Sequence, residues 1–190
     1  MAENSDLLIR LKKGEEAAFD EVVRNTQKMV FNTALNLVQN RSDAEDITQD
    51  VYVKLYEKVE GFKGDSALST WLYRITIRHA LDFEKRKKRK KHGGGLRRMW
   101  IQDVDTEIVE PDNPGISLDS KEQAAYLFAA IKKLPQPQRI AFTLRQLDGL
   151  KVNEIAEILK RSEAGIESLL GRAKTNLRKY LHQYYQQFIS

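Results

Sequence analysis

Residues 43–91 read DAEDITQDVYVKLYEKVEGFKGDSALSTWLYRITIRHALDFEKRKKRKK. The stretch carries three features in a fixed order: an acidic helix start, an aromatic cluster and a block of seven consecutive basic residues, Lys85 to Lys91. The other segments are interpreted as support for this stretch or as a second module tethered to it.

The acidic part predicts a helix with one buried face. Its apolar residues recur every four positions, which is the helical period: Ile47, Val51, Leu55 and Val59. Ser42, with Glu45 three residues on, is expected to cap this helix in a capping box. Polar side chains project from the other side: Asp43, Asp46, Gln49, Asp50 and Lys54. They form either a solvated face or a binding surface, and the charge pattern alone does not decide between the two.

A loop with two glycines follows, and Phe62 lies between them. This Phe either fills the core or shapes a platform for an unpaired base, because aromatic faces stack on bases. The next helix, expected from near Ser66, interleaves aromatic and cationic groups, which suits single-stranded nucleic acid: Trp71, Tyr73, Arg74, Arg78 and His79.

The charge balance favours a polyanionic partner. The net charge is +5 and the sequence pI is about 9.3. A run of seven cations repels itself and needs counter-charge, for which phosphate is the natural source. The alternative is a solvated tail.

Composition excludes several classes of site. The chain has no cysteine, so disulfides, thiolate metal sites and Cys nucleophiles are excluded. Its first residues do not resemble a secretory signal, and no apolar run approaches the ~20 residues needed to cross a bilayer. We expect a cytoplasmic protein without membrane insertion.

The chain is expected to be all-α, with two small helical domains. Residues 1–91 form the first and residues 121–190 the second. Residues 92–120 begin with His92 and three glycines, contain Pro111 and Pro114, and then turn acidic. This composition is typical of a flexible linker.

The second domain has the outline of a helix-turn-helix. Val152, Ile155 and Leu159 predict a short helix, and Ser162 is the expected N-cap of a long final helix. That last helix is expected to expose basic residues: Arg172, Lys174, Arg178 and Lys179. Any small helical bundle could give the same outline.

Taken together, these motifs resemble the bacterial RNA polymerase sigma factors of the extracytoplasmic-function (ECF) group, in the sigma-70 family. The matching residues lie in the same order as in that family. They are Asp43–Asp46 with Gln49–Asp50, Phe62–Gly64, Thr70–Ile75 with Ala80–Asp82, the basic block, Leu134–Pro135 with Gln138–Arg139, Asp148–Leu150, Glu154–Leu159, and Arg172–Lys174 with Leu177.

The resemblance implies a transcription initiation factor that directs core RNA polymerase to promoters and helps to melt them. Polymerase contact, on the beta-prime clamp helices, would fall to Asp43, Asp46, Gln49 and Asp50. Capture of the melted minus-ten element would fall to Phe62, Lys63, Gly64, Asp65, Ser66, Trp71, Arg74, Arg78, Lys85 and Arg86. Reading of the minus-thirty-five element would fall to Ser162, Glu163, Glu167, Ser168, Arg172 and Lys174.

The resemblance also implies further partners. These are the polymerase beta flap, promoter DNA and an anti-sigma factor. The chain departs from the family at Arg78, where Asn is common, at Lys160, where Gly is usual, and at Lys151, where a Ser cap is usual. The family is often basic where Glu167 and Leu169 stand. Leu169 cannot donate a hydrogen bond, which leaves sequence reading by the second domain open and makes an additional DNA-targeting partner an alternative.

Two other classes of protein would also account for parts of the sequence. A free-standing helix-turn-helix regulator would explain the second half but would leave the acidic face unused. A nuclease could hold Mg²⁺ with Asp43, Asp46 and Asp50. The three histidines, His79, His92 and His182, are scattered, and no second cluster supplies the remaining ligands. We therefore expect no enzyme activity, no metal and no cofactor.

Overall fold

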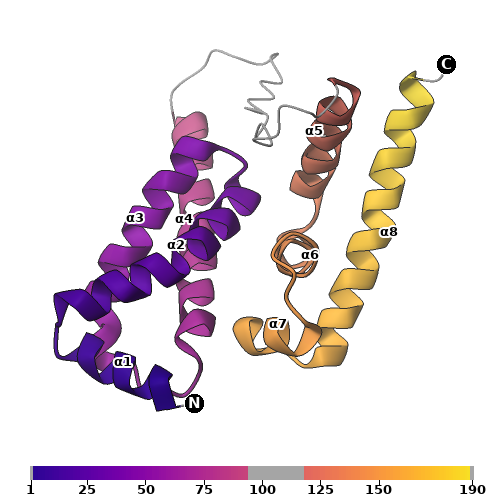
Figure 1. The fold of residues 1–190 in the computed structure, drawn as a ribbon. Coiled ribbons are helices and arrows are strands. Elements are labelled where there is room, and N and C mark those ends of the chain that lie inside the picture. Colours follow the sequence, from indigo (N-terminus) through magenta and orange to yellow (C-terminus); the bar gives the residue numbers. More distant parts are fainter. Residues whose placement is uncertain (1, 94–117, 189–190) are drawn as a thin grey trace.

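The computed structural model describes residues 2–93 and 118–188, and every regular element within those ranges is helical. This confirms the all-α prediction. The elements are α1 (Ala2–Lys12), α2 (Glu16–Val38), α3 (Arg41–Lys58), the 3₁₀ turn η1 (Val59–Gly61), α4 (Leu68–Gly93), α5 (Leu118–Lys133), α6 (Gln136–Gln146), α7 (Val152–Leu159) and α8 (Glu163–Phe188). Helices α1–α4 form one group, the N-terminal unit, and α5–α8 form another, the C-terminal unit (Figure 1).

The buried face of α3 organises the N-terminal unit. Ile47, Val51 and Leu55 are at most 1% exposed and pack with α2 and α4. The expected cap at Ser42 is wrong, because α3 begins at Arg41. Asn40, in an extended conformation, is the N-cap and accepts from the Asp43 N–H at 2.8 Å.

Helix α4 is longer than the sequence suggested. It begins at Leu68, two residues after Ser66, and continues through the basic block to Gly93. Lys and Arg are good helix formers, and carboxylates relieve their repulsion. Lys87 pairs with Asp43 at 2.7 Å, and Lys85 lies 3.5 Å from Asp82.

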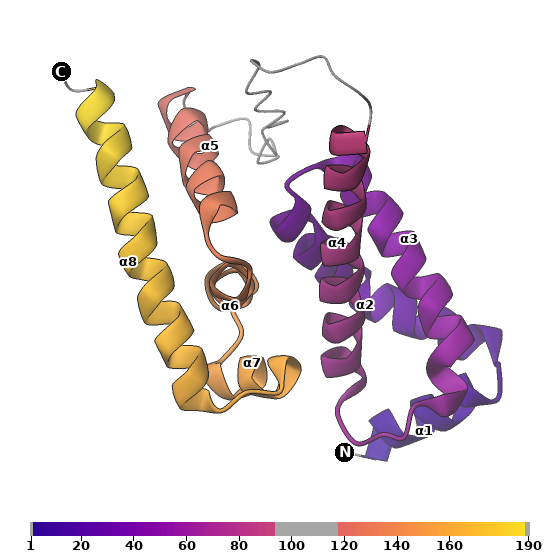
Figure 2. The same cartoon turned by 180° about the vertical axis from the view of Figure 1, so that it is seen from behind.

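The C-terminal unit contains the predicted helix-turn-helix. Pro137 lies in the first turn of α6, where its missing N–H costs no hydrogen bond. Ser162 caps α8, with its Oγ accepting from the Gly165 N–H at 3.2 Å, as expected. Helix α7 lies at one end of the unit, while α5 and the C-terminal part of α8 run side by side (Figure 2).

The turn between α7 and α8 gives Lys160 a backbone conformation that favours glycine. This residue has φ 52° and ψ 50°, a left-handed conformation that a Cβ disfavours. A Lys160→Gly variant removes the steric strain of the left-handed conformation. Part of this stabilisation is offset because glycine raises the conformational entropy of the unfolded chain. We expect it to raise the free energy of unfolding by about 0.5 kcal/mol, measured by urea denaturation. The same change at Lys179, inside α8, should lower it by about 1 kcal/mol.

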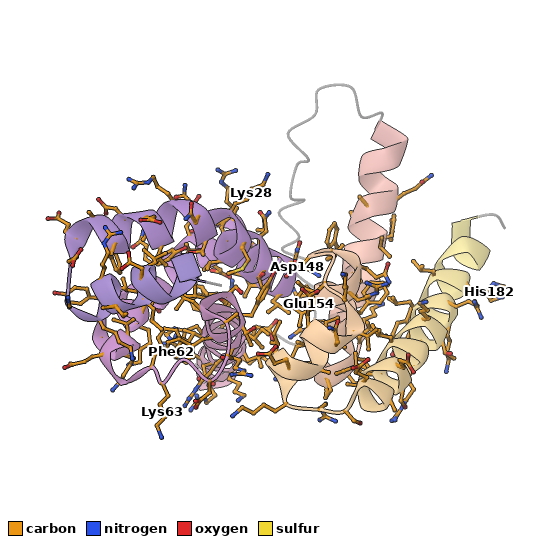
Figure 3. All side chains as sticks on the ribbon, turned by 60° about the horizontal axis from the view of Figure 1, so that its bottom comes forward. Lys28, Phe62, Lys63, Asp148, Glu154 and His182 are labelled. Atoms are coloured by element: carbon orange, nitrogen blue, oxygen red, sulfur yellow. The ribbon has the colours of Figure 1, made fainter. Side chains whose placement is uncertain are left out.

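The two units touch through α2 and α4 on one side and α6 and α7 on the other. Tyr73, on α4, is 8% exposed and interacts with Thr33. Burial raises the pKa of Tyr73 to about 12, and the carboxylates of Asp148 and Glu154, in the C-terminal unit, act in the same direction. Figure 3 shows both acidic residues beside the N-terminal unit.

This pKa predicts a loss of stability at high pH. The folded-state pKa of Tyr73 lies above its ordinary value of 10. Its contribution is therefore complete below that pH and is lost as the pH rises to about 12. The loss is on the order of 2 kcal/mol. The difference in unfolding free energy between the wild type and Tyr73→Phe should shrink by that amount over this range. A constant difference would contradict the assignment.

Candidate nucleic-acid and protein interface

The acidic face of α3 opens onto a surface pocket. This pocket has a volume of about 470 Å³, and the α3 residues that line it are the four predicted polymerase contacts: Asp43, Asp46, Gln49 and Asp50. Across it lie Phe83, Arg86 and Lys87 of α4. Asp43 is half-buried and forms an ion pair with Lys87, whereas Asp46, Gln49 and Asp50 are exposed. The structure therefore brings the four together but leaves only three available to a partner.

Two exposed apolar side chains continue this face, and the sequence analysis did not single them out. Val53 is 58% exposed and Tyr56 is 69% exposed. Val53 lies three residues after Asp50, on the same side of the helix. Val53 does not belong to the apolar series that recurs every four residues along α3, and this could have identified it from the sequence as an exposed apolar residue. An exposed apolar group beside carboxylates is typical of a protein-binding surface.

The glycine loop holds Phe62 inward. Its ring is 8% exposed and packs on Trp71, with the ring centroids 5.2 Å apart and the planes at 35°. Of the two roles expected for Phe62, the structure therefore shows the one in which its side chain fills the core. Lys63 points away from the helices (Figure 3). Between Phe62 and Ser66, the loop exposes Lys63, Gly64 and Asp65.

Gly64 has a conformation that favours glycine, with φ at +78°. A Cβ there would lie 3.7 Å from the Leu8 side chain of α1, which is ordinary contact, so the backbone angle and not crowding is the constraint. The half-buried Ser66 hydroxyl accepts from Arg74 Nη1 at 3.4 Å.

The two arginines of α4 differ in their surroundings. The Arg78 side chain is 82% exposed and lies 3.9 Å from Asp82. Arg74 contacts the C-terminal unit, donating from Nη2 to the Glu157 carbonyl at 2.8 Å and from Nε to the Ile158 carbonyl at 3.2 Å. Further along, Lys85 and Arg86 are exposed. Along α4, Arg78, Lys85 and Arg86 are thus exposed to solvent, whereas Arg74 is hydrogen-bonded to α7.

The exposed face of the first turns of α8 is small and mixed in charge. Glu163, Glu167, Ser168, Arg172 and Lys174 are exposed, and Arg172 Nη2 donates to Ser168 Oγ at 2.7 Å. Leu169 is 7% exposed and belongs to the core. The side chain of Leu169 therefore points into the bundle, and its lack of a hydrogen-bond donor has no bearing on the reading of DNA. Glu167 remains on the exposed face.

No group of three or more His, Asp or Glu side chains that could hold a metal ion occurs among the described residues. Asp43, Asp46 and Asp50 do not form such a cluster, and His79 Nδ1 lies 3.9 Å from Asp50. Within the same part of the chain, no helix is long and apolar enough to span a membrane.

Comparison with known proteins agrees with this geometry. Residues 22–90 match the family model described as Sigma-70 region 2, and residues 124–177 match Sigma-70, region 4. The ECF RNA polymerase sigma-E factor of Haemophilus influenzae is 31% identical over 170 residues, covering 88% of this chain and 89% of that protein. Its Escherichia coli K12 counterpart is 31% identical over 170 residues, covering 88% of each.

Two solved structures share the fold. CnrH, in complex with the cytosolic domain of CnrY, has a TM-score of 0.68 at 20% identity and covers 95% of this chain and 97% of its own. The sigma factor RpoE of Bartonella quintana, in complex with the anti-sigma factor NepR, has a TM-score of 0.61 at 23% identity, covering 86% and 96%. The chain belongs to the ECF RNA polymerase sigma factors. It is a transcription initiation factor and not a free-standing regulator.

Proposed function

We propose that the exposed face of α3 docks on the clamp helices of core RNA polymerase. The observation that carries this proposal is the row of Asp46, Gln49, Asp50 and Val53, in which carboxylates adjoin an exposed apolar side chain on one rigid helix. Charges of this kind select a basic partner and its register, and the apolar group adds contact area. Asp43 acts indirectly, because its ion pair with Lys87 ties α3 to α4.

The minus-ten element is assigned to the loop and to α4. Lys63, Gly64, Asp65 and Ser66 would line the place of the extruded base. The contact between Phe62 and Trp71 supports this assignment, because it holds the loop against α4. Arg74, Arg78, Lys85 and Arg86 follow the melted strand. Flipping a base costs a few kcal/mol, which stacking of about 1–3 kcal/mol per base offsets. Binding energy alone performs this work, so no hydrolysis and no cofactor is required.

The minus-thirty-five element is assigned to the start of α8. Ser162, Glu163, Glu167, Ser168, Arg172 and Lys174 would enter or flank the major groove, as the second helix of a helix-turn-helix does. Glu167 would repel phosphate but can accept from a cytosine amino group. The C-terminal unit would also contact the beta flap.

The proposed domains are residues 1–91 and 121–190, joined by the linker 92–120. The described helices end and begin close to these bounds, at Gly93 and Leu118, and residues 94–117 lie outside the described part of the chain.

Regulation is proposed to involve an anti-sigma factor. Two solved relatives of similar fold are complexes, one with the anti-sigma factor NepR and one with the cytosolic domain of CnrY. Purified from its own cells, the tagged chain should carry a protein that competes with core polymerase. A purified chain that is free of such a competitor under all growth conditions would contradict this proposal.

Transcription in vitro tests the assignment of α3. Purified bacterial core polymerase and a pool of promoter fragments should give transcripts that depend on this chain. The variant Asp46→Arg with Asp50→Arg should bind core at least tenfold more weakly, because like charges then face each other at the interface. Its matched control is Asp6→Arg with Asp20→Arg, which reverses two exposed acids elsewhere and should bind normally. Equal binding by both variants would contradict the assignment.

A further inference from the structure

Helix α1 lies against the segment that carries the base-capture loop. It contacts η1, the turn that leads into this loop, as well as α2. Figure 2 shows α1 beside the segment that joins α3 to α4. Helix α1 ends at Lys12, whereas the match to Sigma-70 region 2 begins at residue 22. The loop is therefore in contact with a helix that the family model does not include.

The Leu8 side chain of α1 reaches the backbone of Gly64 in the loop. A Cβ at Gly64 would lie 3.7 Å from Leu8 Cδ2, and Leu8 is the only described residue within 4 Å of that position apart from the chain neighbours of Gly64. Leu8 is half-buried and packs against the hydrophobic core. The exposed backbone of Gly64 thus rests on an apolar side chain that the core holds in place.

The middle of the loop has few other constraints. The Phe62 N–H donates to the Val59 carbonyl at 3.1 Å, and the Ser66 hydroxyl accepts from Arg74 at 3.4 Å, so both ends are held. Between them, residues 63–66 form no backbone–backbone hydrogen bond within the described part of the chain. A segment without such bonds is placed by packing, and a gap beneath it forfeits dispersion contacts. The contact with Leu8 therefore sets the position of Gly64.

Helix α1 is itself fixed on α2. Leu11 is 3% exposed and belongs to the core. The Arg10 guanidinium lies between two carboxylates, with Nε 2.9 Å from Glu15 and Nη1 3.6 Å from Glu21. Such partly exposed pairs contribute little to stability, but two acceptors on one planar guanidinium restrict its orientation. Helix α1 can therefore act as a rigid support for the loop.

We propose that Leu8 is a positioning residue for base capture, which holds the loop where Lys63, Asp65 and the Gly64 backbone face the extruded base. The inference rests on the proposed function of this loop. Hydrogen bonds to a base edge discriminate between bases only when donors and acceptors are held in place. The cations of α4 contact phosphates, which carry no sequence information. Loss of the Leu8 side chain should therefore weaken the choice of base more than the binding of the strand.

Two pairs of variants test this proposal. Leu8→Ala removes the contact, and its matched control is Ile9→Ala, at the next residue of α1, which is 51% exposed. Leu8→Met conserves the volume and should behave as the wild type. Arg10→Gln loosens α1 on α2 and keeps Leu8. Its matched control is Arg24→Gln, at an exposed residue of α2, because a change in net charge by itself alters affinity for DNA.

Motion of the loop is the first readout. The chain has no cysteine, so Lys63→Cys supplies a single site for a nitroxide spin label, used for this measurement alone. Lys63 is exposed and points away from the helices (Figure 3). The label should have a shorter rotational correlation time in Leu8→Ala and, to a smaller extent, in Arg10→Gln, with unchanged helical circular dichroism. Both controls should resemble the wild type. Unchanged motion in both Leu8→Ala and Arg10→Gln overturns the proposal.

Choice of base is the second readout. Holoenzyme assembled from core RNA polymerase and each unlabelled variant is mixed with a pool of random-sequence single strands. The bound strands are sequenced, and those bound by core alone are subtracted. The wild type, Leu8→Met and Ile9→Ala should enrich one base at the captured position. Leu8→Ala should lower this enrichment about fivefold while binding nearly as much of the pool.

This readout separates positioning from stability, because a destabilised protein would bind less of the pool with the same choice of base. Equal enrichment by Leu8→Ala and Ile9→Ala overturns the link between α1 and base choice. If the wild type enriches no base, the proposed function of the loop fails. The motion of the label at position 63 still decides in that case whether α1 supports the loop.

Discussion

A Trp71→Ala variant is expected to lose about 3 kcal/mol of unfolding free energy and to stop opening promoters. The indole packs on Phe62 with ring centroids 5.2 Å apart, and this pair anchors the loop to α4. Removing it leaves a void beneath the loop and frees Phe62 to move. Urea denaturation followed by circular dichroism measures the stability, and permanganate reactivity of promoter thymines measures opening.

Trp71→Phe separates the two roles. It keeps an aromatic ring against Phe62, so most of the stability should return. If the indole also stacks on the melted strand, opening should return only in part, since a smaller ring provides less stacking. Full stability in Trp71→Ala would show that the ring pair does not anchor the loop.

Leu144→Ala is expected to destabilise the C-terminal unit by about 2–5 kcal/mol. Leu144 is 0% exposed, and truncation of its side chain leaves a cavity in the core beside α6. The hydrophobic core runs without a break from the N-terminal unit through α6 and α7. Destabilisation of α6 should therefore also weaken the contact with α2 and α4. The distance between fluorophores attached at Lys28→Cys on α2 and Lys179→Cys on α8 should lengthen before the N-terminal unit unfolds.

Trp71 can report the N-terminal unit alone once the second tryptophan is replaced by Trp100→Phe. In that background, Leu144→Ala should lower the midpoint of the circular dichroism transition more than the midpoint reported by Trp71. A matched change in the N-terminal unit, Leu72→Ala, at a residue that is also 0% exposed, should do the reverse. Coincident shifts in both variants would mean that the chain unfolds as one cooperative unit.

The sequence pattern was sufficient for the helices and for the acidic face. Four-residue spacing identified Ile47, Val51 and Leu55, and each is buried. This works because helical periodicity is local and depends on neighbouring residues only. The N-cap at Asn40 was not predicted. Asn, Ser and Asp all favour this position, and the backbone angles, which the sequence does not show, decide between them. The same limit applied to the basic block, whose composition fits a tail as well as a helix.

Contacts between distant residues could not be predicted. The pairing of Glu84 with Arg139 and of Asp148 with Thr33 and Asn36 depends on how α6 meets α2 and α4. No spacing rule encodes that meeting, because the residues are 55 or more positions apart. A family motif position also says nothing about burial: Leu169, at a position where the family is often basic, is 7% exposed and packs in the core.

The uninterrupted course of α4 makes the basic block a rigid lever. The helix spans 26 residues, or about 39 Å at 1.5 Å per residue, and its first half is clamped in the core while Lys85 and Arg86 stand beyond it. The angular phase of these cations is thus set by buried residues such as Leu72 and Ile77. One alanine inserted after Asp82 would rotate the whole block by about 100° while leaving its charge intact. Such a variant would keep its net charge but change the direction in which Lys85 and Arg86 project from α4. Loss of function in it would show that the direction of these side chains matters as well as their charge.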